Sequence, residues 1–344
     1  MVPEPRLALS ADERLALYLA PLAAHARQRF PTTADAALLV NPRKSFAFSL
    51  ERSRDYLADK SFRDDPVVLA RLQELYVDPV VAAYRRLGLD RRFQLVIGDD
   101  LTANTTPTYH KARRIEDGGA SVLLPLNERR HFEPIHTVEA SDVPFDEKQG
   151  RVVWRGATTG YFRARPHGSR YHLYRHWDRF EANAGLDLGF SPIVQLSKGF
   201  AAAHGDIERC ARPRLTLAQQ LQAKYLLALE GNDVASGLKW MLASNSLVIM
   251  PRPTNESWAC ESRLVPGVHY VEIRHDLADL EEAYAWCEAN PRACREMAEN
   301  GKRFMRGFRD KAQEATLFDE VVREYHRRVR LVDPHNLVTG EVAR

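Results

Sequence analysis

The sequence predicts an α/β protein of two domains, the second of which holds a parallel sheet covered by helices. Three observations support this prediction. The chain has 344 residues, enough for two domains of about 150 residues each. Hydrophobic residues make up 44% and charged residues 28%, as in ordinary folded proteins. Beyond Gly150, short apolar runs alternate with helical stretches, which is typical of βαβ units.

The first half of the chain is expected to form helices and short strands. Ser10 and Glu13 have the spacing of a capping box, at the start of a helix that would kink at Pro21. The stretch 134–150 is polar and aperiodic, and is therefore the predicted domain boundary. The predicted segments are helices over residues 10–28 and 66–87 and strands over residues 93–97 and 121–126.

Strands and helices alternate in the second half, which indicates parallel strands buried on both faces. Such a domain would be Rossmann-like, and an amphipathic helix is expected after it over residues 311–331. The predicted strands are residues 151–154, 225–229, 247–250 and 268–273, and the predicted helices are residues 234–243 and 277–289.

Charge, cysteine content and hydropathy exclude several classes of protein. There are 49 basic and 46 acidic side chains, so the basic excess of a nucleic-acid-binding domain is missing, whereas a small anion needs only a local cluster. The four cysteines lack zinc or redox spacing and indicate reduced thiols. No apolar stretch approaches the roughly 20 residues of a membrane span, and no signal peptide is evident. We expect the protein in the cytoplasm, and the inner face of the cytoplasmic membrane is a further expected location.

The densest candidate site lies where a strand is expected to end, at Glu230. Gly231 would turn the chain there, and a helix is expected to begin near Val234. The N–H groups and dipole of a helix start attract a diphosphate, and ligands of open α/β sheets bind beyond the carboxyl ends of the strands. Ser236 and Lys239 would add a hydroxyl and a charge. A glycine-containing turn that only connects strand and helix explains the same residues.

Other phosphate-binding and metal-binding patterns are missing from the sequence. It contains no G-x-x-x-x-G-K-[S/T] and no G-x-G-x-x-G, which disfavours a P-loop enzyme and a dinucleotide dehydrogenase. It also contains no Asp-x-Asp pair, the usual metal clamp of single-domain nucleotide-sugar transferases. Neither a metal site nor a cofactor is expected. Backbone N–H groups and cationic side chains would then have to stabilise any leaving diphosphate.

Arginines supply the candidate cations. Arg155 and Gly156 follow a predicted strand, and Arg163 lies in the same loop. Guanidinium groups match phosphate oxygens and stabilise a leaving diphosphate in a cleft with little water. A loop of solvated arginines explains the same pattern. Four arginines farther along the chain are interpreted as solvated surface residues, namely Arg165, Arg170, Arg175 and Arg179.

Two adjacent carboxylates, Asp99 and Asp100, follow Gly98 at the end of a predicted buried strand. A carboxylate at such a position can act as a general base that removes the proton of an attacking hydroxyl group. Aspartates also form turns after strands, so the pattern alone supports both interpretations equally.

Three runs in this order resemble the CAP10-like glycosyltransferases, which form glycosyltransferase family 90: W-R-G-x-T-T-G, K-Y-L-L-x-L-E-G-N-D-V-A-S-G-L-K-W and P-G-V-H-Y-V-x-I-x-x-D-L-x-D-L. This family includes bacterial lipopolysaccharide-modifying and capsule enzymes and eukaryotic protein O-glucosyltransferases. The resemblance extends over about residues 93–301 and is strongest over residues 224–280. It does not extend to the first ninety residues.

The resemblance implies a GT-B architecture, in which two Rossmann-like domains face a cleft and the C-terminal helix crosses back. It implies inverting transfer of glucose or xylose from a UDP-sugar, without a metal ion, to a hydroxyl group of a saccharide or lipid-linked saccharide. The corresponding divisions are an acceptor-side domain over residues 1–148, a nucleotide-sugar-binding domain over residues 149–310, and a helix that packs back on the first domain over residues 311–344.

The resemblance also assigns roles to residues. Asp100 best matches the catalytic base, with Asp99 as its competitor, and Arg163 matches a donor-site arginine. Glu256 belongs to an E-x-W run of the bacterial members, for which a contact with ribose or base is the expectation. The expected donor-binding residues are Arg155, Gly156, Thr158, Arg163, Gly231, Asn232, Asp233, Val234, Ala235, Ser236, Lys239 and Glu256.

One departure from the family pattern leaves an alternative. Eukaryotic members carry a further diphosphate-contacting arginine at the position of Gly237. This difference favours a second hypothesis, a non-catalytic nucleotide-binding or polyanion-binding protein that has kept the fold. A third hypothesis, RNA binding through the arginines after Arg163, lacks a basic domain or an aromatic stacking motif to support it.

Overall fold

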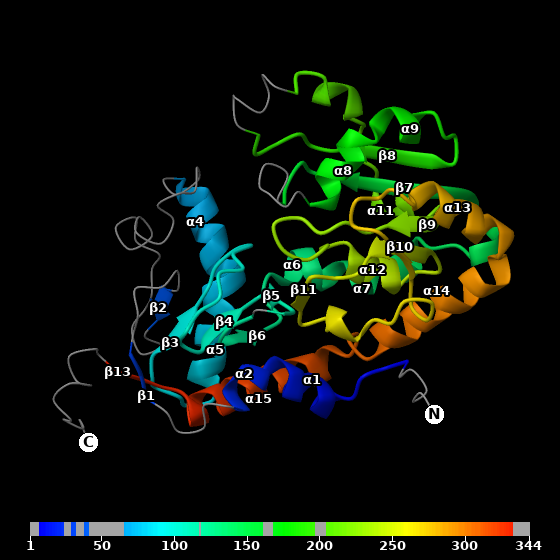
Figure 1. The fold of residues 1–344 in the computed structure, drawn as a ribbon. Coiled ribbons are helices and arrows are strands. Elements are labelled where there is room, and N and C mark those ends of the chain that lie inside the picture. The colour runs from blue at the N-terminus through cyan, green and yellow to red at the C-terminus, as the bar shows by residue number, and fades with distance from the viewer. Residues whose placement is uncertain are drawn as a thin grey trace. The chain divides into compact units, whose positions relative to one another are not determined.

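The computed structural model of the protein describes residues 7–23, 29–31, 38–40, 65–116, 118–160, 168–196 and 204–332 (Figure 1). The chain forms two compact units that alternate along the sequence. Unit 1 comprises Met1–Leu9, Arg129–Asn255 and Glu261–Arg309, and unit 2 comprises Ser10–Glu128, Glu256–Cys260 and Asp310–Arg344. Within the described ranges, no helix is long and apolar enough to cross a membrane.

The core of unit 1 is a sheet of five parallel strands in the order β12-β10-β9-β7-β8. The chain first passes from β7 outward to β8, then returns across β7 to β9 and continues through β10 to β12. The direction of strand addition therefore reverses between β7 and β9, and ligands of open α/β sheets bind at such a switch point. The strands are β7 (Gln149–Gly156), β8 (Leu186–Phe190), β9 (Ala223–Leu227), β10 (Leu247–Pro251) and β12 (Val271–Ile273).

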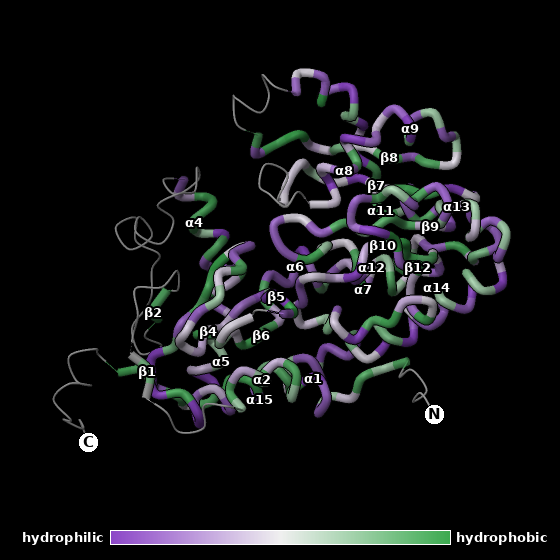
Figure 2. The backbone as a smooth tube through the Cα atoms, viewed as in Figure 1, coloured by the Kyte–Doolittle hydropathy of each residue, from purple (hydrophilic) through white to green (hydrophobic). Residues whose placement is uncertain are grey.

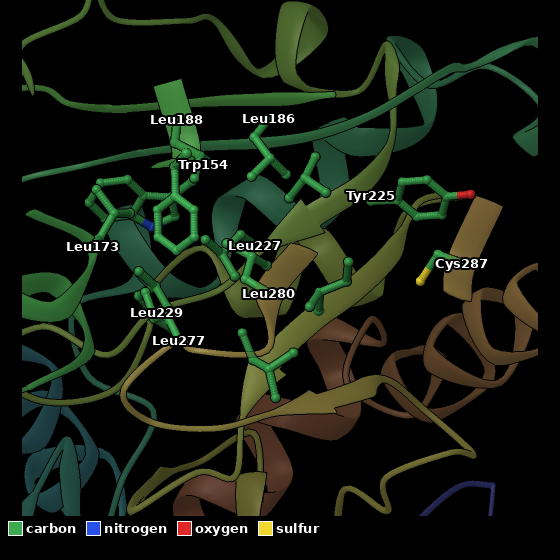
Figure 3. Packing of buried hydrophobic residues seen from close by; sticks show 14 of the residues in the cluster. Trp154, Leu173, Leu186, Leu188, Tyr225, Leu227, Leu229, Leu277, Leu280 and Cys287 are labelled. Carbon is green, nitrogen blue, oxygen red and sulfur yellow. The ribbon is translucent and has the colours of Figure 1, made fainter. Parts of the chain in front are cut away.

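Helices bury this sheet. One face packs into a hydrophobic cluster in which Trp154 and Tyr225 meet leucines from strands and helices (Figure 3). Val153, Leu226 and Val248, which alternate with residues of the cluster, are also buried, so both faces are covered. The covering helices are α8 (Ser169–Arg175), α9 (Trp177–Glu181), α12 (Leu238–Leu242), α13 (Leu280–Ala289) and α14 (Pro291–Arg306). Hydrophilic and hydrophobic residues are mixed along α13 and α14 (Figure 2), as expected of helices that bury one side.

Unit 2 contains a four-stranded sheet in the order β2-β3-β4-β6, in which only the pair β2 and β3 is antiparallel. Tyr84, Phe93, Tyr109 and Tyr325 pack ring against ring in its core. The strands are β2 (Leu38–Val40), β3 (Phe93–Leu95), β4 (Thr108–His110) and β6 (Ser121–Leu123).

The helices of unit 2 come from distant parts of the sequence. The long helix α15 (Lys311–Arg328) packs against α1 (Ala11–Tyr18) and α5 (Asp78–Arg86). Arg14 and Glu314 form a buried ion pair across α1 and α15. The unit also contains α2 (Ala20–Ala23), α4 (Pro66–Leu72) and a π-helical turn (Gln73–Val77). Two short strand pairs are also present. In the first, β1 (Arg29–Pro31) pairs with β13 (Arg330–Val332), and in the second, β5 (Ala112–Arg114) pairs with β11 (Asn255–Ser257).

The mixed α/β class and the parallel strands are confirmed. The predicted capping box at Ser10 is present, and the predicted helix over residues 66–87 is present as α4, the π-helical turn and α5. The helix predicted from Val234 is wrong in its start, because α12 begins only at Leu238. The predicted divisions after residues 148 and 310 stay predictions.

Candidate functional site

Two glycine-containing loops meet at the switch point of the unit 1 sheet. The loop after β7 contains Gly160, and the loop after β9 contains Gly231. A Cβ atom added to Gly160 would lie 1.9 Å from the carbonyl oxygen of Gly231, and the φ angle of Gly160 is +74°. The Gly160 N–H group donates to Asn232 Oδ1 at 3.0 Å. Two runs separated by about seventy residues in the sequence therefore form one surface at the carboxyl end of the sheet.

Arg170 of α8 ties these two loops together. Its Nη1 donates to the Ala157 carbonyl at 2.9 Å and to Thr159 Oγ1 at 2.7 Å, and its Nη2 donates to the Leu229 carbonyl at 2.9 Å. The guanidinium group also lies 5.6 Å from the centre of the Trp154 ring. The interpretation of Arg170 as a solvated surface residue is therefore wrong, because its guanidinium group donates hydrogen bonds to both loops.

The loop after β7 is further fixed by two of the predicted site residues. Thr158 Oγ1 donates to the Val194 carbonyl at 2.6 Å and accepts from the Val194 N–H group at 2.8 Å. A Cβ atom at Gly156 would lie 2.4 Å from the Trp154 ring, so this position requires glycine. Both residues shape the loop, and Thr158 uses its hydroxyl group for that purpose.

Arg155, predicted to contact phosphate, is bound within unit 1. Its Nη2 donates to Asp187 Oδ1 at 2.6 Å, its Nη1 to the carbonyls of Trp154 and Asp187, and its Nε to the Pro213 carbonyl. Only 9% of its side chain is exposed. The prediction that Arg155 holds a diphosphate is therefore corrected, because each of its three guanidinium nitrogen atoms already donates a hydrogen bond to an oxygen atom of the protein.

A small pocket lies beside these loops, at the carboxyl ends of β9 and β10. Its apolar wall consists mainly of side chains from the segment 234–238 and from the end of β10, while its polar groups include two carboxylates. The lining residues are Ser169, Ala228, Glu230, Val234, Ala235, Leu238, Met250, Pro251, Arg252, Pro253, Asn255, Glu261 and His275.

Glu230 is the polar residue of this cavity that links it to the glycine loops, because Gly231 follows it directly. Its Oε1 accepts from the N–H groups of Thr254 and Asn255 at 3.0 Å, and its Oε2 accepts from Thr254 Oγ1. Burial raises the pKa of Glu230 to about 7, against the lowering effect of these hydrogen bonds, and nearby Glu261 raises it further. From the sequence alone, Glu230 is predicted only as the end of a strand.

Lys239 does not reach a phosphate site, contrary to the prediction. Its Nζ lies 2.7 Å from Glu261 Oε1, with exposed side-chain fractions of 1% and 2%. This buried ion pair lies behind the cavity wall that Glu261 forms. The predicted diphosphate site at a helix start is also wrong as stated, because α12 spans only Leu238–Leu242. A helix this short has little macrodipole to offer an anion.

Backbone donors remain available in the loop between β9 and α12. Val234 and Ala235 are buried against the cavity, and Ser236 is partly exposed. Among the described residues, the N–H groups of these three residues have no protein acceptor. Successive N–H groups without acceptors form concavities that bind anions. Asp233 in the same loop is buried.

In unit 2, the predicted catalytic carboxylates have different partners. Asp99 Oδ1 lies 2.5 Å from the ammonium group of Lys111, of whose side chain only 1% is exposed. Asp100 Oδ1 accepts from the N–H and hydroxyl groups of Thr102 at 2.8 and 2.6 Å. The partly exposed Asp100 carboxylate thus carries no ion pair in the described part of the chain, whereas that of Asp99 neutralises a buried lysine.

His110 lies against the same loop of unit 2. It is 1% exposed, and its Nε2 is 2.8 Å from Asn104 Nδ2. Burial lowers the pKa of His110 to about 4, against the raising effects of the Asp100 carboxylate and backbone. A neutral imidazole therefore packs beside Asp100 at physiological pH.

The last predicted donor contacts are those of Glu256 and Arg163. Glu256 belongs to unit 2, where its Oε1 accepts from Arg113 Nε and Nη2 at 2.9 and 2.7 Å in a buried ion pair. A contact between Glu256 and a donor would compete with this pair. Arg163 lies outside the described residues. Within the part of the chain that the structure describes, no three His, Cys, Asp or Glu side chains gather to hold a metal ion.

Comparison with known proteins gives two kinds of match. A model of glycosyl transferase family 90 matches residues 136–331. The chain is 35% identical over 234 residues to O-glucosyltransferase LpsA of Dichelobacter nodosus, which covers 68% of this chain and 66% of that protein. It is 27% identical over 290 residues to uncharacterized protein 035R of Invertebrate iridescent virus 3, covering 78% of this chain and 25% of that protein. The chain thus spans just under two thirds of the bacterial relative and a quarter of the viral one.

Proposed function

Because the chain belongs to glycosyl transferase family 90, we propose that it transfers a sugar from a UDP-sugar to a hydroxyl group, with inversion at the anomeric carbon. One observation carries the donor half of this proposal. The loops after β7 and β9 meet at Gly160 and Gly231, at the switch point where open α/β sheets bind ligands. A diphosphate placed there would lie beside backbone N–H groups and the Arg170 guanidinium.

The donor site acts by neutralising the departing diphosphate. The N–H groups of Val234, Ala235 and Ser236 would hold phosphate oxygens, and Arg170 supplies positive charge while it fixes both loops. Arg163, which follows the same β7 loop, is proposed as a second cation. The proposal needs no metal ion, and the chain contains no Asp-x-Asp pair to clamp one.

Asp100 is the proposed general base. Its carboxylate accepts the proton of the acceptor hydroxyl group while that oxygen attacks the anomeric carbon. The bond between the anomeric carbon and the β-phosphate oxygen breaks, and its electron pair leaves with UDP. Asp99 is less suited to this role, because it already neutralises the buried Lys111 ammonium group.

The finer parts of the proposal rest on the relatives. The name O-glucosyltransferase of the Dichelobacter nodosus protein supports glucose, and the family resemblance adds xylose as the other candidate. A saccharide or lipid-linked saccharide, such as lipopolysaccharide or capsule, is the proposed acceptor. The GT-B architecture and a cytoplasmic location, at or near the membrane that carries such an acceptor, belong to the same proposal.

Donor hydrolysis tests the function without an acceptor. Purified protein is incubated with UDP-glucose or UDP-xylose, with and without EDTA, and UDP release is measured. We expect release above background with one donor, unaffected by EDTA. Asp100→Asn serves as the control for contaminating hydrolases, since it should bind UDP but release little of it. Release that is equal in the variant, or that stops with EDTA, contradicts the proposed mechanism.

A non-catalytic nucleotide-binding protein is the second candidate. Gly237 favours it, because eukaryotic members carry a diphosphate-contacting arginine at this position. A Cβ atom at Gly237 would lie 3.0 Å from Met241 Cε and 3.2 Å from Trp240 Nε1, so a larger residue would displace these side chains. UDP binding without any donor turnover would support this candidate.

A further inference from the structure

The loop that carries Asp100 in unit 2 is closed by hydrogen bonds between its own residues. Asp100 Oδ1 accepts from the N–H and hydroxyl groups of Thr102 at 2.8 and 2.6 Å. The Thr102 carbonyl oxygen in turn accepts from Asn104 Nδ2 at 3.2 Å. These local bonds fix residues 100–104 relative to one another. The position of the carboxylate in the unit therefore depends on the contacts that Asn104 makes beyond the loop.

Asn104 attaches this loop to the unit 2 sheet at two points. Its carbonyl oxygen accepts from the Ala120 N–H group at 2.8 Å, directly before β6 begins. Its side-chain Nδ2 lies 2.8 Å from Nε2 of His110, the last residue of β4. Because β4 pairs with β3 on one side and with β6 on the other, the His110 ring is carried by a strand that is held on both edges. The imidazole thus joins the loop to the sheet through a side chain.

The Thr102 carbonyl determines how Asn104 and His110 share their hydrogen bond. A carbonyl oxygen only accepts, so the amide of Asn104 must turn its nitrogen toward Thr102, since the reverse orientation would bring two oxygen atoms together. The second hydrogen of that nitrogen is then donated to His110 Nε2. Nε2 must therefore be the unprotonated nitrogen of a neutral ring. Burial lowers the pKa of His110 to about 4, which keeps the ring in this neutral form at physiological pH.

The His110 ring also lies beside Asp100 itself. The two groups that raise the pKa of His110, against the larger effect of burial, are the carboxylate and the backbone of Asp100. His110 and Asn104 are 1% and 2% exposed. A buried donor that loses its acceptor is left without a partner from the solvent, so the pair strongly favours one conformation of the loop.

We propose, on the basis of the function proposed above, that His110 positions the general base Asp100 through Asn104. The path runs from the ring through the Asn104 amide and Thr102 to the carboxylate. Thr102 donates to Oδ1, so Oδ2 is the oxygen that takes the proton of the acceptor hydroxyl group. Because His110 and Asn104 are buried, they do not contact the acceptor, and they are positioning residues for the base.

Donor hydrolysis by substituted proteins tests this path. His110→Leu replaces the ring by a side chain that accepts no hydrogen bond, and Asn104→Ala removes the same bond from the other side. With whichever of UDP-glucose and UDP-xylose the wild type hydrolyses, we expect the kcat of UDP release to fall about ten- to hundredfold in both variants, the effect of misplacing a catalytic group by about 1 Å. The KM of the donor and the affinity for UDP should not change, because the proposed donor site belongs to unit 1.

Two further variants separate the hydrogen bond from a general loss of stability. In His110→Gln an amide oxygen can accept from Asn104 in place of Nε2, so this variant should restore most of the kcat that His110→Leu loses. His326→Leu is the matched control. The ring of His326 belongs to the same unit but packs edge-on against Tyr84, with 6.0 Å between the ring centres. The control should keep the wild-type kcat, even where its melting temperature falls.

Combination with Asp100→Asn shows whether His110 acts through the carboxylate. In that background His110→Leu should lower kcat no further, since the two substitutions affect one group. A further loss of equal size, or a wild-type kcat in either His110→Leu or Asn104→Ala, overturns the positioning role. If His110→Leu does not fold, Asn104→Ala decides. If instead the wild type releases no UDP from either donor, or Asp100→Asn keeps the wild-type kcat, the proposed function itself fails.

Discussion

Gly160 and Gly231 touch backbone to backbone, so that a Cβ atom on Gly160 would stand 1.9 Å from the Gly231 carbonyl oxygen. Each glycine belongs to a loop at the end of a neighbouring strand of the unit 1 sheet. Their contact, together with the Gly160 hydrogen bond to Asn232, forces both loops into one arrangement. The proposed diphosphate site depends on this arrangement.

Gly160→Ala should abolish detectable UDP binding and lower the melting temperature. The added methyl group meets backbone, which cannot move aside as a flexible side chain can. Gly267→Ala is the matched control, because Gly267 has a φ angle of +73° but nothing within 4 Å of its added Cβ. The control should lose only about 1–2 kcal/mol of stability to the left-handed backbone and keep UDP affinity. If Gly160→Ala and Gly267→Ala changed the melting temperature and the UDP affinity equally, the contact between the two loops would have no special importance for UDP binding.

Arg170→Ala should weaken UDP binding and reduce the free energy of unfolding by about 2–4 kcal/mol, because it leaves the Ala157 and Leu229 carbonyls without their donors. Arg175→Ala removes an exposed arginine from the same helix and should change neither quantity. Urea unfolding and UDP titration of both variants make the comparison. Unchanged UDP affinity in Arg170→Ala would contradict its role at the site.

Asp99 and Asp100 should give opposite results when each is changed to asparagine. Asp100→Asn can still accept from Thr102, so it should keep its melting temperature while transfer falls at least about a hundredfold. Asp99→Asn leaves the buried Lys111 ammonium group without its carboxylate and should cost about 2–4 kcal/mol of stability. Single-turnover rates and unfolding curves are the measurements. If the Asp99→Asn variant remained stable but transferred no sugar, Asp99 and not Asp100 would be the general base.

Glu230→Gln should stabilise the protein increasingly as pH rises from 5 to 8. The pKa of Glu230 is raised from 4.5 to about 7 on folding, so its unfavourable burial as a charge begins above pH 4.5 and is complete above about pH 7. The difference at pH 8 should be on the order of 3 kcal/mol. The other charged groups at the cavity, namely Glu261, Lys239, His275 and Arg252, are present in both proteins, so the difference reports only the Glu230 charge and its interactions with them, including the repulsion by Glu261. Parallel stability curves for the two proteins would contradict the raised pKa.

The sequence alone predicts those features of the fold that depend on residues close to one another in the chain. The capping box at Ser10 and the buried strands β9 and β10 follow from neighbouring residues, and all three were predicted. The run Leu186–Phe190 was not recognised as β8, since its apolar residues are interrupted by Asp187 and Gly189. Asp187 binds Arg155 and Gly189 makes room for Arg212, which only the folded sheet reveals.

The contact between the two predicted loops is observed, whereas their role as a phosphate site stays a prediction. The glycine loops after β7 and β9 were identified as a phosphate site, and they do meet. Arg155 and Lys239 were expected to be cations for phosphate, but each has an acidic partner far away in sequence. Arg170 and Glu230 were missed because their importance comes from contacts that cross between loops.

Amide hydrogen exchange with and without UDP tests the central claim most directly, because it reports the N–H groups that are proposed to hold the nucleotide. We predict slower exchange in the presence of UDP over residues 156–160 and 230–237, and over the cavity segment 250–255. Protection confined to other parts of the chain, or no change at saturating UDP, would contradict a nucleotide site at the carboxyl end of the unit 1 sheet.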